Sequence, residues 1–149
     1  MGLIARFAVL AALGLGCAAE PCLAETPAEA ASRWGLLGAW RTDCRAPVTQ
    51  DGSELVYAVR NGRLFLDRDW GDGEDSSEVA SATIDADGSI AVVIVFPSIS
   101  QTRLNAFIKD GSKRIRSMVS KDVTSGEYSI KDGKFTSGDG VSSWLIRCR

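Results

Sequence analysis

Histidine does not occur in this chain of 149 residues. Without imidazole, neither a serine–histidine–aspartate nor a cysteine–histidine nucleophile can be built, and oxygen atoms are the ready ligands for any cation. The chain also lacks a large excess of either sign of charge, because its formal net charge is only -2. The chain therefore has no overall basic field of the kind that holds nucleic acid, and we expect no nucleic-acid partner.

Apolar residues at helical spacing are missing as well. After the first two dozen residues, no stretch repeats them over three helical turns, so a parallel sheet has no crossover helices to build from. The long apolar run Phe7–Leu15 has about nine residues, which is too short to span a bilayer. We expect no membrane span.

The first residues are typical of an export signal. Met1–Arg6 carries one positive charge, the apolar run follows, and Cys22-Leu23-Ala24 offers small residues before a cut at Glu25. Such a signal predicts a periplasmic or secreted protein.

Two other processing sites compete, a cut after Ala19 and a lipoprotein cut that would acylate Cys17. Either would leave Cys22 unpaired in an oxidising compartment. A cut after Ala24 leaves only Cys44 and Cys148, an even number, so we predict a signal peptide over residues 1–24.

Composition does not shift along the remaining chain, which indicates one domain. Residues 25–35 are rich in alanine and charge, and Pro27 suits the first turn of a brief helix. Because this segment has no evident apolar face, we predict a loose N-terminal arm. Residues 36–149 are predicted to form the folded domain.

Asp-Gly and Asn-Gly turns punctuate that domain, and such dipeptides supply the positive φ that tight hairpins need. They separate stretches that favour strands. These stretches are Leu37–Asp43, Glu54–Arg60, Arg63–Trp70, Glu78–Asp85, Ser89–Phe96, Thr102–Lys109, Lys113–Asp122, Glu127–Lys131 and Ser143–Cys148. The pattern predicts an all-β fold, a single closed or nearly closed antiparallel up-and-down barrel of about eight strands.

Alternation indicates how the strands face. In Thr102–Lys109 we expect the side that carries Leu104, Ala106 and Ile108 to be buried and the side that carries Arg103 and Asn105 to be wet, with Phe107 as an exception. In the next strand, Ile115 and Val119 lie opposite Arg114, Arg116 and Ser120. The stretch Ile90–Phe96 is apolar on both sides, so we expect another segment or a partner to cover its outside.

The first and last predicted strands each carry one tryptophan close to one cysteine, Trp40 before Cys44 and Trp144 before Cys148. We expect both tryptophans to take part in closing the barrel. If these strands are neighbours in a closed barrel, a disulfide can join the two cysteines. It would close a loop of about 100 residues, worth nearly 5 kcal/mol in the chain-entropy model.

Gly38-Ala39-Trp40 on the first strand and Arg147 on the last resemble the Gly-x-Trp and late arginine of the lipocalin and wider calycin superfamily. The resemblance implies a small exported barrel in which the arginine lies across the tryptophan ring and closes one end. Glycine would allow close backbone approach there. The chain is also similar to small bacterial periplasmic inhibitors of metalloproteases, which share export, a one-disulfide barrel and Gly-x-Trp after an N-terminal arm.

Other clusters suggest weaker alternatives. The acidic stretch Asp67–Asp75 could hold calcium, but Gly71 stands where an EF-hand loop needs an oxygen ligand, so we expect a solvated loop and no metal. The basic residues within 109–121 are interpreted as a solvent-exposed face of a hairpin, in preference to a site for an anionic partner. Apolar groups near strand ends are candidates for a ligand or partner rim: Trp34, Trp70, Phe96 and Ile99.

Catalysis is not expected, because the paired carboxylates Asp67 and Asp69 have no apolar surroundings that would bury them. We predict an exported, monomeric, non-enzymatic module without a cofactor that binds a protein partner or inhibits one. The alternative is a carrier of a small apolar ligand inside the barrel. A cavity above about 300 Å³ would favour the carrier, and a filled barrel with a projecting segment 25–34 would favour the partner role.

Overall fold

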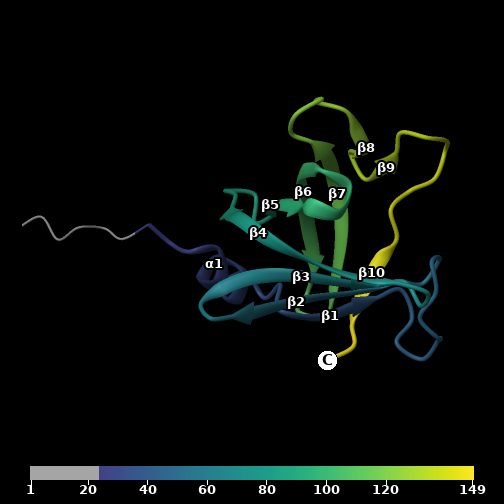
Figure 1. The fold of residues 1–149 in the computed structure, drawn as a ribbon, viewed down its shortest axis with the longest axis horizontal. Coiled ribbons are helices and arrows are strands. Elements are labelled where there is room, and N and C mark those ends of the chain that lie inside the picture. Colours follow the sequence, from purple (N-terminus) through teal and green to yellow (C-terminus); the bar gives the residue numbers. More distant parts are fainter. Residues whose placement is uncertain (1–23) are drawn as a thin grey trace, which may run out of the picture.

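The structure is a computed structural model that describes residues 24–149 (Figure 1). Apart from Ala24, the predicted export signal lies outside the described residues, and so do Cys17 and Cys22. Within the described range, no helix has both the length and the apolar character needed to cross a membrane.

Strands make up most of the described chain. The elements are α1 (Pro27–Trp34), β1 (Gly38–Arg41), β2 (Glu54–Arg60), β3 (Arg63–Asp69), β4 (Glu74–Ile84), β5 (Ile90–Phe96), the 3-10 helix η1 (Pro97–Ile99), β6 (Gln101–Asp110), β7 (Arg114–Asp122), β8 (Tyr128–Lys131), β9 (Lys134–Phe135) and β10 (Trp144–Arg147). Predicted limits agree within one or two residues, except that β4 begins at Glu74 instead of Glu78. The short strand β9 was not predicted.

Strand β10 closes the sheet. Strands β1 to β7 form an antiparallel meander, and β10 lies between β1 and β7. Its Arg147 is paired with Trp40 of β1, and its Leu145 is paired with Ile115 of β7. These pairings close eight strands into a barrel, which confirms the predicted all-β, antiparallel up-and-down architecture. Closure pairs two strands that would otherwise be free edges.

One predicted strand, β8, lies outside the closed barrel. Strand β7 pairs with β10 over Arg114–Arg116 and, further along the same edge, with β8 through Ser120 and Lys121. Strand β8 then pairs with β9, and the two form a hairpin at the far end of β7 (Figure 1). The predicted neighbour of the first strand, the last strand of the chain, is the one that closes the barrel, and β8 is the additional strand.

Residues 25–35 are not a loose arm, so that prediction is wrong. Thr26 and Glu29 form a reciprocal capping box at the start of α1, and Gly35 ends the helix with a φ of 90°. Ala30 and Ala31 are fully buried. The prediction failed because alanine looks neutral in a sequence, yet its small side chain lets a helix pack closely against a barrel.

Helix α1 lies against β3 and β4 at one end of the barrel (Figure 1). Trp34 is 4% exposed, and its indole Nε1 donates to the carbonyl of Gly88 at 2.7 Å. The Lys109 ammonium donates to the carbonyl of Trp34 at 2.9 Å. A cation at the last turn of a helix complements the helix dipole, so this contact fixes α1 over the barrel end.

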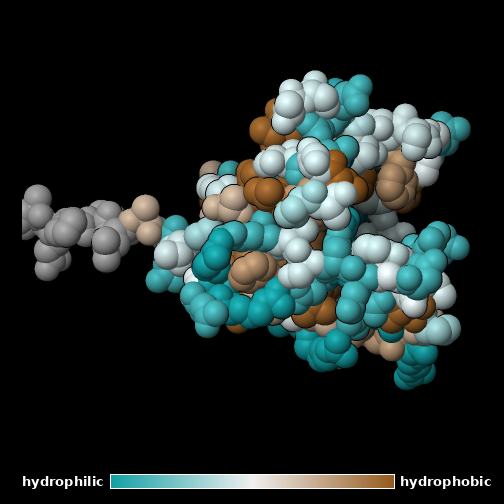
Figure 2. All heavy atoms as spheres, in the orientation of Figure 1, coloured by the Kyte–Doolittle hydropathy of each residue, from teal (hydrophilic) through white to brown (hydrophobic). Residues whose placement is uncertain are grey.

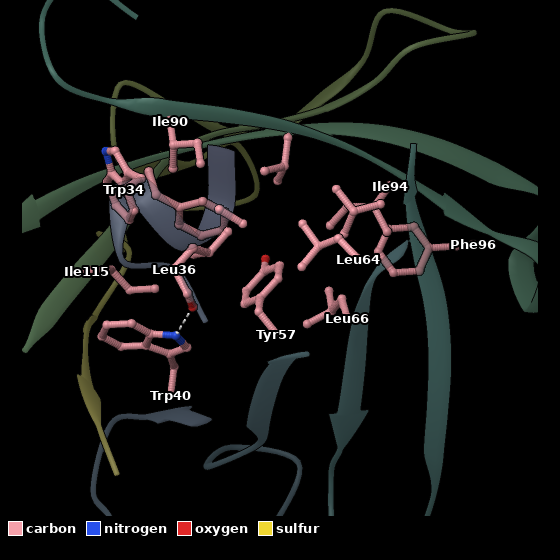
Figure 3. Packing of buried hydrophobic residues seen from close by; sticks show 14 residues of the cluster. Trp34, Leu36, Trp40, Tyr57, Leu64, Leu66, Ile90, Ile94, Phe96 and Ile115 are labelled. Atoms are coloured by element: carbon pink, nitrogen blue, oxygen red, sulfur yellow. Dashed lines mark hydrogen bonds between the residues drawn. The ribbon is translucent and has the colours of Figure 1, made fainter. Parts of the chain in front are cut away.

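The core extends from the side chains next to α1 to those that line the opposite half of the barrel (Figure 3). Its fully buried members include Leu36, Trp40, Leu64 and Ile90. The indole Nε1 of Trp40 donates to the carbonyl of Leu36 at 2.7 Å, which ties the first strand to the turn after α1 (Figure 3). This end of the barrel is therefore filled with side chains.

Strand β6 faces opposite to the prediction. Arg103 and Asn105 point into the barrel, because they pair in register with Ile94 and Val92, whose side chains are fully buried. Phe107, predicted as the exception, is 5% exposed and belongs to the core. The polar row was assigned to solvent because alternation shows two faces but not which one lies inside.

The outer face of β5 is only partly covered. Ala91 and Val93 are half-buried, whereas Val95 is 39% exposed. The N-terminal segment, which could have covered this face, instead forms α1 against β3 and β4. Within the described chain, the predicted full cover of this strand is therefore missing.

Candidate functional site

The two ends of the barrel differ, and the residues of the Gly-x-Trp resemblance meet at the closed end. The Arg147 guanidinium lies 4.8 Å from the ring centroid of Trp40 and donates to the carbonyl of Gly35. Gly38 has a φ of 127°, and a Cβ there would lie 2.6 Å from the carbonyl oxygen of Arg149. Glycine is therefore required at position 38, where the two terminal strands approach each other.

The predicted disulfide between Cys44 and Cys148 is present, with a Cα–Cα distance of 5.5 Å. It joins the segment after β1 to the segment after β10. Trp144, predicted to take part in closure, lies elsewhere: it is half-buried beneath the Arg114 guanidinium, 4.8 Å from its ring centroid. Its neighbour Leu145 is the residue of this strand that points into the cavity.

A cavity of about 390 Å³ opens at the other end of the barrel, next to the β8–β9 hairpin. Apolar and aromatic side chains form much of its wall, and polar side chains from β3, β6 and β7 interrupt that wall. The lining residues include Leu55, Tyr57, Leu66, Arg68, Phe96, Arg103, Asn105, Phe107, Ser117, Ser120, Ile130, Phe135 and Leu145. The arrangement suits a small molecule with an apolar body and a polar end.

Arg68 is one of two guanidinium groups in this wall. Its Nε donates to Oδ1 of Asp75 at 2.8 Å, its Nη2 also contacts this carboxylate, and its Cζ lies 4.3 Å from the ring centroid of Phe96. Hydrogen bonding to Arg68 lowers the pKa of Asp75, against the opposing effect of burial. Asp75 therefore stays ionised and neutralises Arg68.

Arg103 is the second guanidinium group, and its partners are neutral. Its Nε and Nη2 each lie 3.2 Å from Oγ of Ser120, Nη2 donates to Oγ of Ser129 at 2.6 Å, and Nη1 donates to Oε1 of Gln101 at 3.1 Å. Among residues 24–149 it forms no ion pair.

Asp122 lies opposite Arg103 in the strand register, yet its carboxylate is held elsewhere. Its Oδ1 accepts hydrogen bonds from the backbone N–H groups of Thr124 and Ser125 at 2.8 Å each. The Ser125 N–H is the main cause that lowers the pKa of Asp122, and the charge of Arg103 is the smallest. This carboxylate therefore acts on Arg103 only through space.

Tyr57 is a buried polar group in the cavity wall. It is 2% exposed, and its hydroxyl points among the apolar core side chains (Figure 3). No other described residue hydrogen-bonds to that hydroxyl. Burial raises its pKa, so the phenol stays protonated as a donor. Asn105, nearer the mouth, likewise has a side-chain amide without a partner in the described chain.

The predicted rim residues do not form one rim. Trp34 is buried at the closed end, whereas Phe96 is 3% exposed and lines the cavity from within. Trp70 is half-buried, 5.7 Å from the Arg68 guanidinium, and Ile99 is 51% exposed in η1. Sequence reasoning missed Tyr57, Arg68, Arg103 and Asn105. Its one usable signal was the row of Arg103, Asn105 and Phe107 on one strand face.

Some members of the charged clusters seen in the sequence form local ion pairs. Asp67 is paired with Arg60 at 2.6 Å, and Arg114 is paired with Asp110 at 3.1 Å. No group of three or more acidic or cysteine side chains within the described residues is arranged to hold a metal ion.

Comparison with protein-family models, with curated proteins and with solved structures finds no match to this chain. The resemblance to the lipocalin and calycin superfamily therefore stays a prediction.

Proposed function

We propose that the protein is a non-enzymatic carrier that binds one small organic molecule in the mouth cavity. The observation that carries the proposal is a cavity of about 390 Å³ that reaches Tyr57, a buried phenol without a hydrogen-bond partner in the described chain. Its volume is usual for small-molecule sites. Because Tyr57 lines the cavity, its hydroxyl is available as a hydrogen-bond donor to a ligand.

The carrier was the alternative function predicted from the sequence. The protein-partner or inhibitor role was expected of a filled barrel with a projecting segment 25–34. Helix α1 is instead docked through Ala30 and Ala31, and the mouth is open, so both observations support the carrier.

A protein partner remains a second candidate, supported by exposed apolar side chains. Val95 is 39% exposed, Ile99 is 51% exposed and Val123 is 52% exposed. On the face shown in Figure 2, however, hydrophilic residues predominate and apolar residues form small separate patches. Single exposed apolar residues are normal on monomers, so this support is weaker than that of the cavity.

The chemistry of the lining supports binding over catalysis. Its ionisable side chains among the described residues are Tyr57, Arg68 and Arg103. Burial raises the pKa of Tyr57, and a guanidinium group has no acceptor atom, so none of these side chains suits a general base near neutral pH. The Cys44–Cys148 disulfide supports export, because such bonds persist in oxidising compartments.

A neutral fluorescent probe, N-phenyl-1-naphthylamine, tests the proposal by titration with the purified protein. We expect saturable binding to wild type and a loss of affinity of about tenfold or more in Asn105→Trp, whose indole would fill the cavity. Leu104→Trp is the matched control, since residue 104 is the next position on β6 and faces outward.

Thermal melting of both variants shows whether each is folded. Wild type that fails to bind the probe, or an Asn105→Trp protein that is folded and binds it as tightly as Leu104→Trp does, would refute the carrier function.

A further inference from the structure

We propose that the ligand of the mouth cavity is a monoanionic, amphipathic organic acid, such as a carboxylate or sulfonate, whose charged group binds Arg103. This inference rests on the proposed carrier function and specifies the class of its ligand.

The charge of the cavity is the first argument. Two guanidinium groups line it, and Asp75 neutralises Arg68. Arg103 is half-buried and has only neutral oxygens as hydrogen-bond partners in the described chain. Asp122 acts on Arg103 only through space, whereas Asp75 is directly paired with Arg68. An entering anion can therefore form a direct, hydrogen-bonded ion pair with Arg103 that no described carboxylate forms, and one such group suits one negative charge.

The donors that remain free are the second argument. A guanidinium group has five N–H donors. The contacts to Ser120, Ser129 and Gln101 leave an N–H of Nη1 free, and they also hold the plane of the group in position.

Asn105 supplies a second free donor, because its amide has no partner among the described residues. Two residues further along β6, it points to the same side of the strand as Arg103 and lines the same cavity. The Arg103 and Asn105 donors together can receive the two oxygens of a carboxylate or sulfonate.

The surroundings of these donors are the third argument. Along β6 the row continues with Phe107, and Tyr57 lies edge-on to it with ring centroids 6.2 Å apart. Leu66 and Leu145 complete this part of the wall. A ligand whose acid group binds Arg103 would thus lay its body on aromatic and aliphatic side chains. A fully charged or fully polar molecule would leave this surface unpaired.

Two probes with the same ring skeleton isolate the charge. 8-Anilinonaphthalene-1-sulfonate carries the sulfonate that N-phenyl-1-naphthylamine lacks, and both report binding by fluorescence. For wild type we expect the anionic probe to bind about tenfold or more tightly than the neutral one. The preference should shrink as salt concentration rises.

Arg103→Gln should abolish the preference by weakening the binding of the anionic probe about tenfold or more. Arg103→Lys keeps the charge without the planar fork, so it should retain part of the preference. Arg114→Gln is the matched control. It removes one positive charge from the outside of β7, where Arg114 side-chain exposure is 45%, and should keep the full preference.

The possible results distinguish a failure of the anionic-ligand proposal from a failure of the carrier function. Wild type that binds the two probes equally, or a folded Arg103→Gln protein that keeps the preference, would overturn the anionic ligand and leave the carrier intact. Wild type that fails to bind N-phenyl-1-naphthylamine would refute the carrier function, and the anionic-ligand inference that rests on it would be overturned with it.

Discussion

Gly38 tolerates less change than the other glycines of the closed end. Its φ of 127° is unfavourable for residues with a Cβ, and a Cβ would lie 2.6 Å from the carbonyl oxygen of Arg149. Gly62 also has a positive φ, 75°, but nothing within 4 Å of an added Cβ. The two positions therefore separate backbone strain alone from strain combined with a clash.

Gly38→Ala is expected to lower the free energy of unfolding by about 3 kcal/mol, because the β1–β10 contact must open to admit the methyl group. Gly62→Ala should cost about 1 kcal/mol, from strain alone. Urea unfolding followed by tryptophan fluorescence measures both values. Equal losses would show that close approach at Gly38 is not what requires glycine.

The Asp75 carboxylate should make stability depend on pH. Its folded-state pKa lies below the ordinary value of 3.8, mainly because Arg68 hydrogen-bonds to it. The stabilisation is therefore complete above the ordinary pKa and is lost as pH falls through the lower folded-state pKa. Asp75→Asn should destabilise the protein more at about pH 6 than at about pH 2.

Urea unfolding of wild type and variant at both pH values measures this difference. Asp139→Asn, which replaces an exposed carboxylate, controls for the general effect of removing one negative charge. An Asp75→Asn cost that is the same at both pH values would contradict the ion pair with Arg68.

Helix α1 is held by small contacts at both of its ends. The Thr26–Glu29 capping box begins it, and Lys109 and Arg147 donate to the carbonyls of Trp34 and Gly35 at its end. An isolated helix of this length is not stable in water. Its stability must therefore come from docking, mainly through its buried alanines and Trp34.

Ala31→Asp is expected to lower the free energy of unfolding by about 3 kcal/mol or more, because it buries a carboxylate against the core. Ser32→Asp, one position further on the exposed side of α1, should change it by less than about 0.5 kcal/mol. Urea unfolding of the two variants compares them directly. Similar small effects of both substitutions would contradict the docking of α1 and support the loose arm first predicted for residues 25–35.

The barrel as a whole depends on its two terminal strands being neighbours. Backbone hydrogen bonds already join them. The Ala39 N–H donates to the carbonyl of Arg149 at 3.0 Å, and the Cys148 N–H donates to the carbonyl of Ala39 at 2.8 Å. The disulfide adds a covalent constraint between residues separated by 104 positions. Most of its stabilisation acts on the unfolded chain, whose long loop it closes.

The double variant Cys44→Ser with Cys148→Ser is expected to have a free energy of unfolding about 2 to 5 kcal/mol lower than that of wild type. It should keep the circular dichroism spectrum of a β-sheet protein. Wild type measured in reductant should approach the variant, and the variant itself should not respond to reductant. Equal urea midpoints for wild type with and without reductant would contradict this role of the disulfide.

The class of fold was readable from local signals. Turn dipeptides, alternating strands and the absence of helical spacing depend on neighbours in the chain, and they identified all but the shortest strand. The disulfide followed from the number of cysteines and from the first and last strands. These features need no knowledge of which distant segments touch.

The site was decided by tertiary contacts. Alternation in β6 defines two faces, but only the pairing of Phe107 with Ile90 and of Arg103 with Ile94 turns the polar row inward. The docking of α1 and the position of β8 outside the barrel also depend on segments distant in sequence. Tyr57, Arg68 and Arg103 come from three strands, and only closure of the barrel brings them around one cavity.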